Sequence, residues 1–326
     1  MTEKIDNTKK KMKFGVIGAG KIGTYHIRTL SRMPEVELVG VSDTNLLQAQ
    51  MLAWKYNSLA YKNLSDLLPQ VDAIVVAVPT EYHSEIAIKA MEAGVHCMVE
   101  KPITNSVEDA RKLLERAETK KVVLQVGHVE RFNPAITATR SAIARPRFIE
   151  CHRLAPFSFR STDVDVVMDL MIHDIDIILH LVPSPLKRVD AVGVALLFGH
   201  EDIANARLEF EDGCVANVTA SRVSDKAMRK MRIFSEGSYV SIDFQEKAAM
   251  VYRLNRELLD ARRPGGGPPT MEDLAALPKE FYDIRNIRMG DVEPLGEELK
   301  AFVHAVKTGT PPVVSGEHGL RAMETA

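Results

Sequence analysis

Apolar runs alternate with helically spaced apolar residues along the first part of the chain. The run Val71 to Val78 is almost unbroken, which is typical of a central parallel strand that is covered on both faces. Strands separated by helices in this way predict a doubly wound parallel sheet of the α/β class. We place this Rossmann domain at residues 1–127. Its predicted strands also include Lys13 to Ile17, Val36 to Ser42 and Val122 to Val126, and its predicted helices include Ala49 to Tyr56, Glu81 to Ala93 and Val107 to Lys120.

The spacing changes to a period of two after residue 147, which predicts an α+β domain with a large open antiparallel sheet over residues 128–326. Gly213 and Gly237 lie in turns that join neighbouring runs, as in β-hairpins. We expect about six strands after residue 188. The predicted strands are Phe148 to Leu154, Arg188 to Leu197, Ile203 to Phe210, Cys214 to Ser221, Met228 to Ser235, Tyr239 to Phe244 and Ala248 to Tyr252.

The second domain has one strong helical pattern, Val164 to Leu181, and a final predicted helix, Leu295 to Lys307. Packing of this final helix on the first domain is compatible with the pattern. A single helix covers one face of a large sheet and leaves the other apolar face without cover. We therefore expect a homo-oligomer, a dimer or a tetramer, formed through that face. The segment Ala261 to Pro269 (ARRPGGGPP) is predicted to be a loop and not a phosphate site, because no strand precedes it and no helix follows it.

Composition narrows the classes of function. The chain has 326 residues, enough for two domains, and a net charge of −2, which gives no reason to expect nucleic acid as a partner. Its three cysteines have neither disulfide nor zinc spacing, which favours a reducing compartment. The N-terminus lacks an apolar signal segment, and no apolar run approaches the roughly 18 residues that cross a bilayer. We expect a cytoplasmic protein without a membrane partner.

The first candidate for chemistry is the glycine turn Gly18-Ala19-Gly20-Lys21-Ile22-Gly23. It follows a predicted strand and opens a predicted helix, the context in which G-x-G-x-x-G binds a dinucleotide pyrophosphate. An ordinary strand–turn–helix connection is the alternative. Asp43 favours the dinucleotide, because it ends the second strand at the distance where a carboxylate meets the adenine ribose. Since no Arg or Lys is adjacent to it, we expect NAD rather than NADP as the cofactor.

The second candidate is the corner that ends the stretch Val95 to Thr104 (VHCMVEKPIT). Strand-forming residues lead into Glu100-Lys101-Pro102, and the proline prevents the strand from continuing. Lys101 is therefore held at the carboxyl edge of an open α/β sheet, where ligands bind.

The third candidate is the pair Asp169 and His173, which stand four residues apart on the predicted helix and so share a face. A histidine held by a carboxylate suits proton transfer near neutral pH. A solvated helix face or a satisfied polar pair is the alternative, but apolar residues surround the pair, and ionisable groups in such a setting need partners. A metal site that adds Asp174, Asp176 and His180 is disfavoured, because Asp174 lies about 100° around the helix from His173.

Together these features resemble the Gfo/Idh/MocA oxidoreductases, the glucose-fructose oxidoreductase and inositol dehydrogenase group, over essentially the whole chain. The shared motifs are GAGKIG, Val78-Pro79-Thr80 with His83, the Glu100-Lys101-Pro102 corner, Asp169-x-x-x-His173 and Glu293-Pro294-Leu295. The resemblance implies that Lys101 is the active-site lysine, Asp169 a substrate-orienting aspartate and His173 the acid/base histidine. The C-terminus departs from the pattern, since the family's last helix usually continues beyond the equivalent of Ala326.

We assign ten residues to the cofactor site: Gly18, Gly20, Lys21, Ile22, Asp43, Val78, Pro79, His83, Glu100 and Lys101. For His83, capping or packing is an alternative to a cofactor contact. His128 and Arg131, after the last strand of the first domain, are candidates for substrate contact. The alternative is that Arg131 and Glu130 tie the two domains together by a salt bridge. Arg153, Arg160 and Arg222 are candidates for a substrate diphosphate, because arginine forks match phosphate oxygens. Ordinary surface arginines are the alternative there. No residues are assigned to a metal.

Within the family, VGHVERFNP and the helix around Asp169 look most like the UDP-N-acetylglucosamine 3-dehydrogenase type. Enzymes of that type oxidise the 3-hydroxyl of the nucleotide sugar before a partner aminotransferase acts on the ketone. The resemblance thus implies an NAD-dependent dehydrogenase acting on a sugar or nucleotide sugar. Another sugar or inositol dehydrogenase, a non-catalytic nucleotide sensor and an NAD-dependent glycosidase are the alternatives.

Overall fold

The computed structural model describes residues 10–157, 164–197, 199–255, 282–290 and 292–326. These residues form two compact units. The first comprises the chain to Val129 together with Glu293–Glu324, and the second comprises Glu130–Val292 with the last two residues. Residues 293–324 are thus part of the first unit, whereas a division at residue 128 alone places them in the second. Arg160 and the segment 261–269 lie outside the described residues.

The first unit contains a six-stranded parallel sheet in the order β3-β2-β1-β4-β5-β6, which confirms the predicted Rossmann topology. The order reverses between β1 and β4, and ligands bind beside such a switch point at the carboxyl ends of the strands. The strands are β1 (Met12–Ile17), β2 (Val36–Ser42), β3 (Leu59–Tyr61), β4 (Ala73–Val76), β5 (His96–Glu100) and β6 (Leu124–Gly127).

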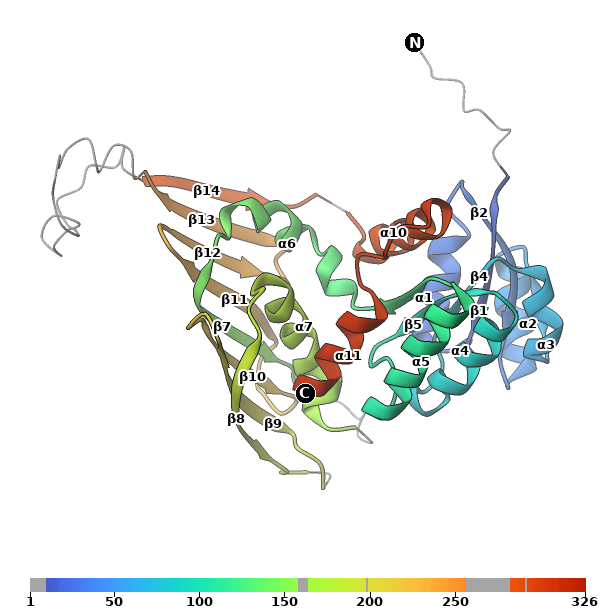
Figure 1. Ribbon diagram of the computed structural model, residues 1–326, viewed down its shortest axis with the longest axis horizontal. Coiled ribbons are helices and arrows are strands. Elements are labelled where there is room, and N and C mark those ends of the chain that lie inside the picture. Colours follow the sequence, from blue (N-terminus) through green and yellow to red (C-terminus); the bar gives the residue numbers. More distant parts are fainter. Residues whose placement is uncertain (1–9, 158–163, 198, 256–281, 291) are drawn as a thin grey trace, which may run out of the picture. The chain divides into compact units, whose positions relative to one another are not determined.

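Helices cover this sheet because its strands are apolar on both faces. Phe14 packs edge-on against Phe302 with 5.9 Å between ring centroids, in a core to which α1, α2 and α10 contribute. Figure 1 shows these helices around the parallel sheet. The buried stripe of α10 explains why residues 293–324 return to this unit: Leu299, Phe302 and Val303 are buried against the sheet. The helices are α1 (Lys21–Leu30), α2 (Leu46–Lys55), α3 (Leu64–Leu67), α4 (His83–Glu92), α5 (Val107–Lys120), α10 (Pro294–Thr308) and α11 (Gly316–Thr325), with 3₁₀ turns at Leu68–Gln70 and Thr80–Tyr82.

The second unit contains an eight-stranded sheet in the order β14-β13-β12-β11-β7-β10-β9-β8. It is mostly antiparallel, as predicted, but β7 and β10 pair in parallel at its centre. The expectation of about six strands after residue 188 missed β14. It also did not give the position of β7 in the sheet, because strand periodicity carries no information about the partner of each strand. The strands are β7 (Pro146–Leu154), β8 (Leu186–Val194), β9 (Ile203–Phe210), β10 (Val215–Ser221), β11 (Met228–Ser235), β12 (Ser238–Asp243), β13 (Ala248–Leu254) and β14 (Tyr282–Arg288).

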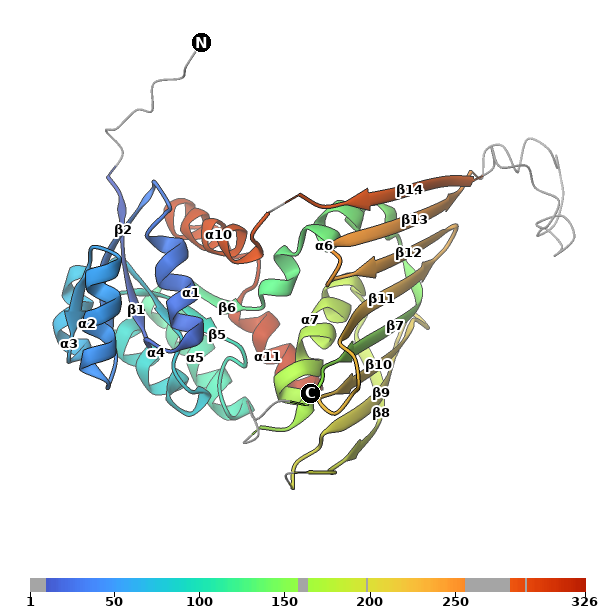
Figure 2. The same ribbon diagram turned by 180° about the vertical axis from the view of Figure 1, so that it is seen from behind.

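Helices of the second unit lie on one side of this sheet. α6 (Pro134–Thr139) and α7 (Ile172–Leu181) occupy the same side in both views (Figure 2). The predicted single helix from residue 164 is wrong at its start, because Val167–Met171 is a π-helical segment, η5, that leads into α7. Short 3₁₀ turns are present at Val129–Phe132 and Arg140–Ala142. Within the described ranges, no helix has both the length and the apolar character needed to cross a bilayer.

Candidate active site

A cavity of about 620 Å³ lies at the carboxyl ends of β1, β2 and β4, in the size range of ligand pockets. A larger depression of about 850 Å³ lies at the opposite, amino ends of β5 and β6, so size alone does not identify the site. The cavity at the carboxyl ends has the chemistry of a dinucleotide site. Seven of the ten predicted cofactor residues line it, namely Gly18, Gly20, Lys21, Ile22, Asp43, Val78 and Pro79.

The glycine turn has the geometry that a pyrophosphate requires. Gly18 has a φ of +103°, and a Cβ there would lie 2.3 Å from the carbonyl oxygen of Ala77. A Cβ on Gly23 would lie 1.9 Å from the carbonyl oxygen of Gly18, so helix α1 packs directly on the turn. A Cβ on Gly20 would enter open space, and Gly20 caps α1 without a side-chain hydrogen bond. The first N–H groups of α1 are therefore accessible to an anion.

Asp43 lies beside this turn and anchors it. Its Oδ2 accepts the Ala19 N–H at 2.6 Å, and its Oδ1 accepts the Asn45 N–H at 2.7 Å. Oδ1 also lies 3.5 Å from the Thr44 hydroxyl, whereas Oδ2 retains capacity for a further hydrogen bond, so the group suits a ribose hydroxyl. Lys62 also lines the cavity, and the sequence analysis missed it. The available signal was its position directly after β3, at the same sheet edge as Asp43.

The Glu100-Lys101-Pro102 corner begins at the last residue of β5 and is not among the residues that line the cavity. Glu100 Oε1 lies 2.7 Å from Nε2 of His26, a buried residue of α1, and Glu100 Oε2 accepts the Lys101 N–H at 3.2 Å. Burial alone raises the pKa of the Glu100 carboxyl, but the His26 contact and the Lys101 N–H outweigh burial and hold its pKa below the ordinary value. Glu100 is therefore ionised, and the corner is built around its carboxylate.

His83 also lies outside the cavity lining, and its contacts support the packing interpretation. The ring is buried, with Nε2 at 2.9 Å from the Val78 carbonyl oxygen and Nδ1 at 2.9 Å from the Pro102 carbonyl oxygen. Burial lowers the pKa of His83 below 6.5, and its carbonyl contacts and the charge of Glu100 only partly oppose this. The imidazole thus joins the turn after β4 to the corner after β5.

Asp169 and His173 lie in consecutive turns, one in η5 and the other in α7, and both are half-buried. The start of this helical segment is fixed by Asp165, whose Oδ1 accepts the N–H groups of Val167 at 2.9 Å and Met168 at 2.8 Å. π-Helical turns are frequent at functional sites. The Asp169 carboxylate and the His173 imidazole are therefore carried by a helical segment whose N-terminus is capped.

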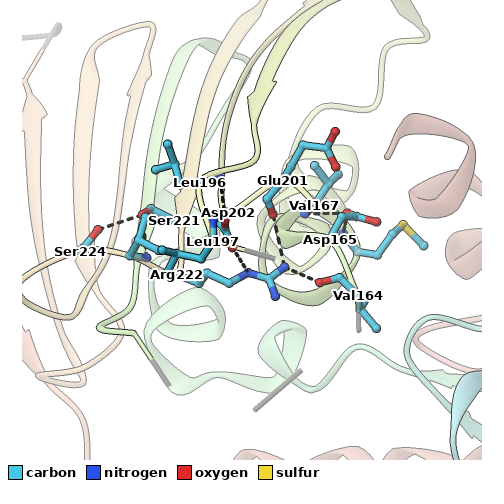
Figure 3. A network of polar contacts seen from close by, with 12 residues as sticks. Val164, Asp165, Val167, Leu196, Leu197, Glu201, Asp202, Ser221, Arg222 and Ser224 are labelled. Carbon is cyan, nitrogen blue, oxygen red and sulfur yellow. Dashed lines mark hydrogen bonds and ion pairs between the residues drawn. The ribbon is translucent and has the colours of Figure 1, made fainter. Parts of the chain in front are cut away.

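Arg222 holds the residue before that cap. Its guanidinium donates to the carbonyl oxygen of Val164 and, at 3.3 Å, to that of Glu201, and it lies 3.7 Å from Asp202 (Figure 3). Asp202 in turn accepts two backbone N–H groups of the loop after β8, at 2.8 and 2.7 Å. Arg222 is buried, and these contacts use its donors to support the segment that carries Asp169.

Arg131 and Arg153, the predicted substrate contacts, each form a buried ion pair. Arg131 donates twice to Asp176, at 2.6 and 2.7 Å, and Arg153 donates twice to Asp174, at 2.8 and 2.9 Å, and once to Glu130 at 3.1 Å. All these pairs lie within the second unit, so none of them ties the two units together. The carboxylates of Asp174 and Asp176, on the apolar helix α7, are thus paired with arginines of the same unit.

His128, Asp174 and Asp176 are all buried. His128 is 1 % exposed, in the first unit. Asp174 and Asp176, considered above for a metal, are the partners of the two arginines, and the part of the chain that the structure describes contains no cluster of three or more His, Cys, Asp or Glu side chains suited to a metal ion.

Comparisons with known proteins identify both units. Residues 12–128 match the family described as "Oxidoreductase family, NAD-binding Rossmann fold", and residues 135–240 match "GFO/IDH/MocA C-terminal domain". These matches confirm the predicted NAD cofactor. The chain is 36% identical to UDP-N-acetylglucosamine 3-dehydrogenase from Acidithiobacillus ferrooxidans over 97% of this chain and 95% of that protein. A solved structure of that enzyme has a TM-score of 0.85 at 35% identity and covers the same shares of the two chains.

A second relative is scyllo-inositol 2-dehydrogenase (NAD(+)) from Bacillus subtilis, 30% identical over 94% of this chain and 89% of that protein. Levoglucosan dehydrogenase in complex with NADH and levoglucosan has a TM-score of 0.81 at 19% identity, over 97% of each chain, which is a likeness of fold.

Proposed function

Because this chain belongs to the Gfo/Idh/MocA family of NAD-binding oxidoreductases, we propose that it oxidises the 3-hydroxyl of UDP-N-acetylglucosamine. The observation that carries this substrate is the 36% identity to a UDP-N-acetylglucosamine 3-dehydrogenase along both whole chains. The residues assigned to catalysis are consistent with it: Lys101 lies directly after β5, Asp169 in η5 and His173 in α7.

The proposed roles follow from the chemistry of the side chains. His173 removes the proton from the reacting hydroxyl, since imidazole suits proton transfer near neutral pH. Lys101 donates a hydrogen bond to the same oxygen and stabilises the negative charge that develops on it. Asp169 orients the substrate or the imidazole. NAD, when bound, supplies the acceptor for the hydride.

The cavity residues fit this cofactor by their own geometry. The uncapped N-terminus of α1 suits a pyrophosphate, Gly20 leaves room for it, and Asp43 suits the adenine ribose. The mechanism further requires Lys101 and His173 to meet at one hydroxyl group, which the variants below test.

The test is a substrate panel followed by NADH absorbance. We expect NADH with UDP-N-acetylglucosamine, and no comparable rate with N-acetylglucosamine, myo-inositol or scyllo-inositol. Lys101→Ala and His173→Ala should each lower kcat by orders of magnitude while NAD binding persists. Near wild-type turnover in both variants would refute the assigned roles, and NADH from an inositol alone would move the substrate to that of the second relative.

The same assay separates the other class of chemistry. An NAD-dependent glycosidase borrows the hydride and returns it, so it releases free sugar without net NADH. Sugar release measured beside absorbance distinguishes that outcome from a dehydrogenase.

We also propose that two copies associate through the open face of the eight-stranded sheet. Side chains on that face form a row across neighbouring strands: Phe148 pairs with Phe234, Phe234 with Tyr239, and Tyr239 with Tyr252. Their ring centroids lie 4.9 to 5.8 Å apart along the last two contacts, and 5.9 Å along the first. Residues of the opposite alternation face the core.

Charges on this face are paired with each other, which supports a second copy as the occupant. Lys230 lies 3.3 Å from Asp243, and Arg232 lies 2.6 Å from Glu150, so a like copy meets little net charge. Tyr239→Lys should convert an oligomer to a monomer in analytical ultracentrifugation. A wild-type monomer at micromolar concentration would refute the proposal.

The proposed product, a 3-keto sugar nucleotide, has the carbonyl that an aminotransferase requires, and we propose such an enzyme as the pathway partner. The three cysteines Cys97, Cys151 and Cys214 are free thiols, which supports a reducing compartment such as the cytoplasm.

A further inference from the structure

Two buried histidines hold the residues on either side of Lys101. His26 is 0% exposed and belongs to α1, and His83 is 1% exposed and begins α4. The first contacts Glu100 and the second contacts Pro102. Neither histidine is needed by the reaction as proposed above, so their burial at this corner calls for another explanation.

His26 fixes the residue that precedes Lys101. The ionised carboxylate of Glu100 can only accept hydrogen bonds, so Nε2 of His26 must carry the proton that it donates at 2.7 Å. The other carboxylate oxygen accepts the Lys101 N–H at 3.2 Å. A Cβ on Gly127 would lie 2.9 Å from that oxygen, so the glycine makes room for the carboxylate. Both oxygens of Glu100 thus have fixed positions, and one of them holds the lysine's own amide.

His83 fixes the residue that follows Lys101. Its Nδ1 lies 2.9 Å from the Pro102 carbonyl oxygen, and its Nε2 lies 2.9 Å from the Val78 carbonyl oxygen. Val78 lines the cofactor cavity, so one ring joins the cavity rim to the lysine corner. A neutral imidazole donates from only one nitrogen, and the two carbonyls compete for that proton.

We propose that His26 and His83 are positioning residues, which set the backbone of the corner so that the Lys101 ammonium meets the reacting oxygen. This inference rests on the proposed role of Lys101. Its physical basis is that catalysis depends on placement within a fraction of an ångström, and a displacement of about 1 Å costs roughly 100-fold in rate.

The chain offers a matched control, a third histidine on β5, the strand that ends at Glu100. His96 begins β5, and its Nδ1 accepts the Val123 N–H at 2.9 Å. It is a histidine with a backbone partner, like His83, but it lies at the amino end of the strand whose carboxyl end carries Glu100. His96→Leu should lower the melting temperature and leave kcat unchanged.

The first experiment compares His26→Leu with His26→Gln by steady-state kinetics and NAD titration. A glutamine amide places a donor near the position of Nε2, and leucine places none. We expect the leucine variant to lose roughly 10- to 100-fold in kcat, with the Kd for NAD within about twofold of wild type, and the glutamine variant to recover most of the loss. A purely structural role would lower the melting temperature without this division between kcat and NAD binding.

The second experiment separates the two arms of His83. Asparagine places its amide near Nδ1 and keeps the Pro102 contact, whereas glutamine places its amide near Nε2 and keeps the Val78 contact. We expect His83→Asn to retain most of kcat but to bind NAD more weakly. His83→Gln should retain NAD binding and lose roughly tenfold in kcat.

The outcomes distinguish failure of this inference from failure of the proposed function. Wild-type kcat in His26→Leu and His83→Gln, with an inactive Lys101→Ala, overturns the positioning roles alone. If Lys101→Ala is itself active, the proposed function fails. Hydrogen exchange then tests whether the two histidines hold the corner. Amides of residues 100–103 should exchange faster in His26→Leu than in His96→Leu whether or not the enzyme turns over, and equal exchange refutes the inference.

Discussion

Arg153→Met tests whether the buried arginines serve the fold or the substrate. The guanidinium lies in a bidentate pair with Asp174 and also contacts Glu130, and the three side chains are 4%, 3% and 14% exposed. Burial lowers the pKa of Arg153, and the attraction of the two carboxylates outweighs burial and raises it above the ordinary value. The arginine is thus the cation that pairs with two acids in the interior of the second unit.

The magnitude follows from what the substitution leaves behind. Removing one partner of a buried ion pair costs about 3–5 kcal/mol, because the remaining charge is buried without compensation. In a unit of this size, each kcal/mol lowers the melting temperature by about 2–4 °C, so we expect a loss of roughly 6–20 °C. Replacing both members by apolar residues, Arg153→Met with Asp174→Leu, should restore much of the loss.

Calorimetry and kinetics together provide the assay. If Arg153 instead contacted a substrate diphosphate, Arg153→Met would raise KM roughly 10- to 100-fold and leave the melting temperature nearly unchanged. Arg188→Met is the matched control, since it removes an exposed pair with Asp190 and should change little. A melting temperature within about 2 °C of wild type for Arg153→Met would refute the reasoning from burial.

Three further predictions concern the first unit. Asp43→Ala should weaken NAD binding by about 10- to 100-fold and reduce the discrimination against NADP, measured by fluorescence titration, and equal affinities of the wild type for the two cofactors would exclude the ribose role. Gly23→Ala should abolish NAD binding and lower stability by about 1–3 kcal/mol or more, because its Cβ would lie 1.9 Å from the Gly18 carbonyl oxygen, and calorimetry with NAD checks both. The lowered pKa of Glu100 contributes stability that is present above its unfolded value of 4.5 and is lost as the pH falls through the folded value, so melting temperatures of wild type and Glu100→Gln should converge as the pH falls below 4.5, and a constant gap would contradict the assignment.

Much of the candidate site is encoded locally. The glycine turn, Asp43 and the Glu100-Lys101-Pro102 corner were each predicted because strand ends, glycines and prolines impose their geometry within a few residues. The Rossmann topology followed from the alternation of strands and helices for the same reason. The identity of the cofactor was predictable from these short-range features.

Pairings between distant residues were decided only by the tertiary structure. Arg131 was predicted to contact substrate and Arg153 to contact its diphosphate. Nothing in their own neighbourhoods indicated that Asp176 and Asp174 pair with them from a helix more than twenty residues away. His26 gave no signal at all, because its partner Glu100 lies 74 residues along the chain.

The sequence by itself therefore determined the elements, the dinucleotide turn and the chemical groups of the site. The tertiary structure decided which charged side chains form buried ion pairs and where residues 293–324 pack. It also decided which residues contact Glu100 and Pro102 on either side of Lys101. The physical reason is that backbone geometry and periodicity act over a few residues, whereas the partner of a buried charge or of a strand is chosen by packing that brings remote segments together.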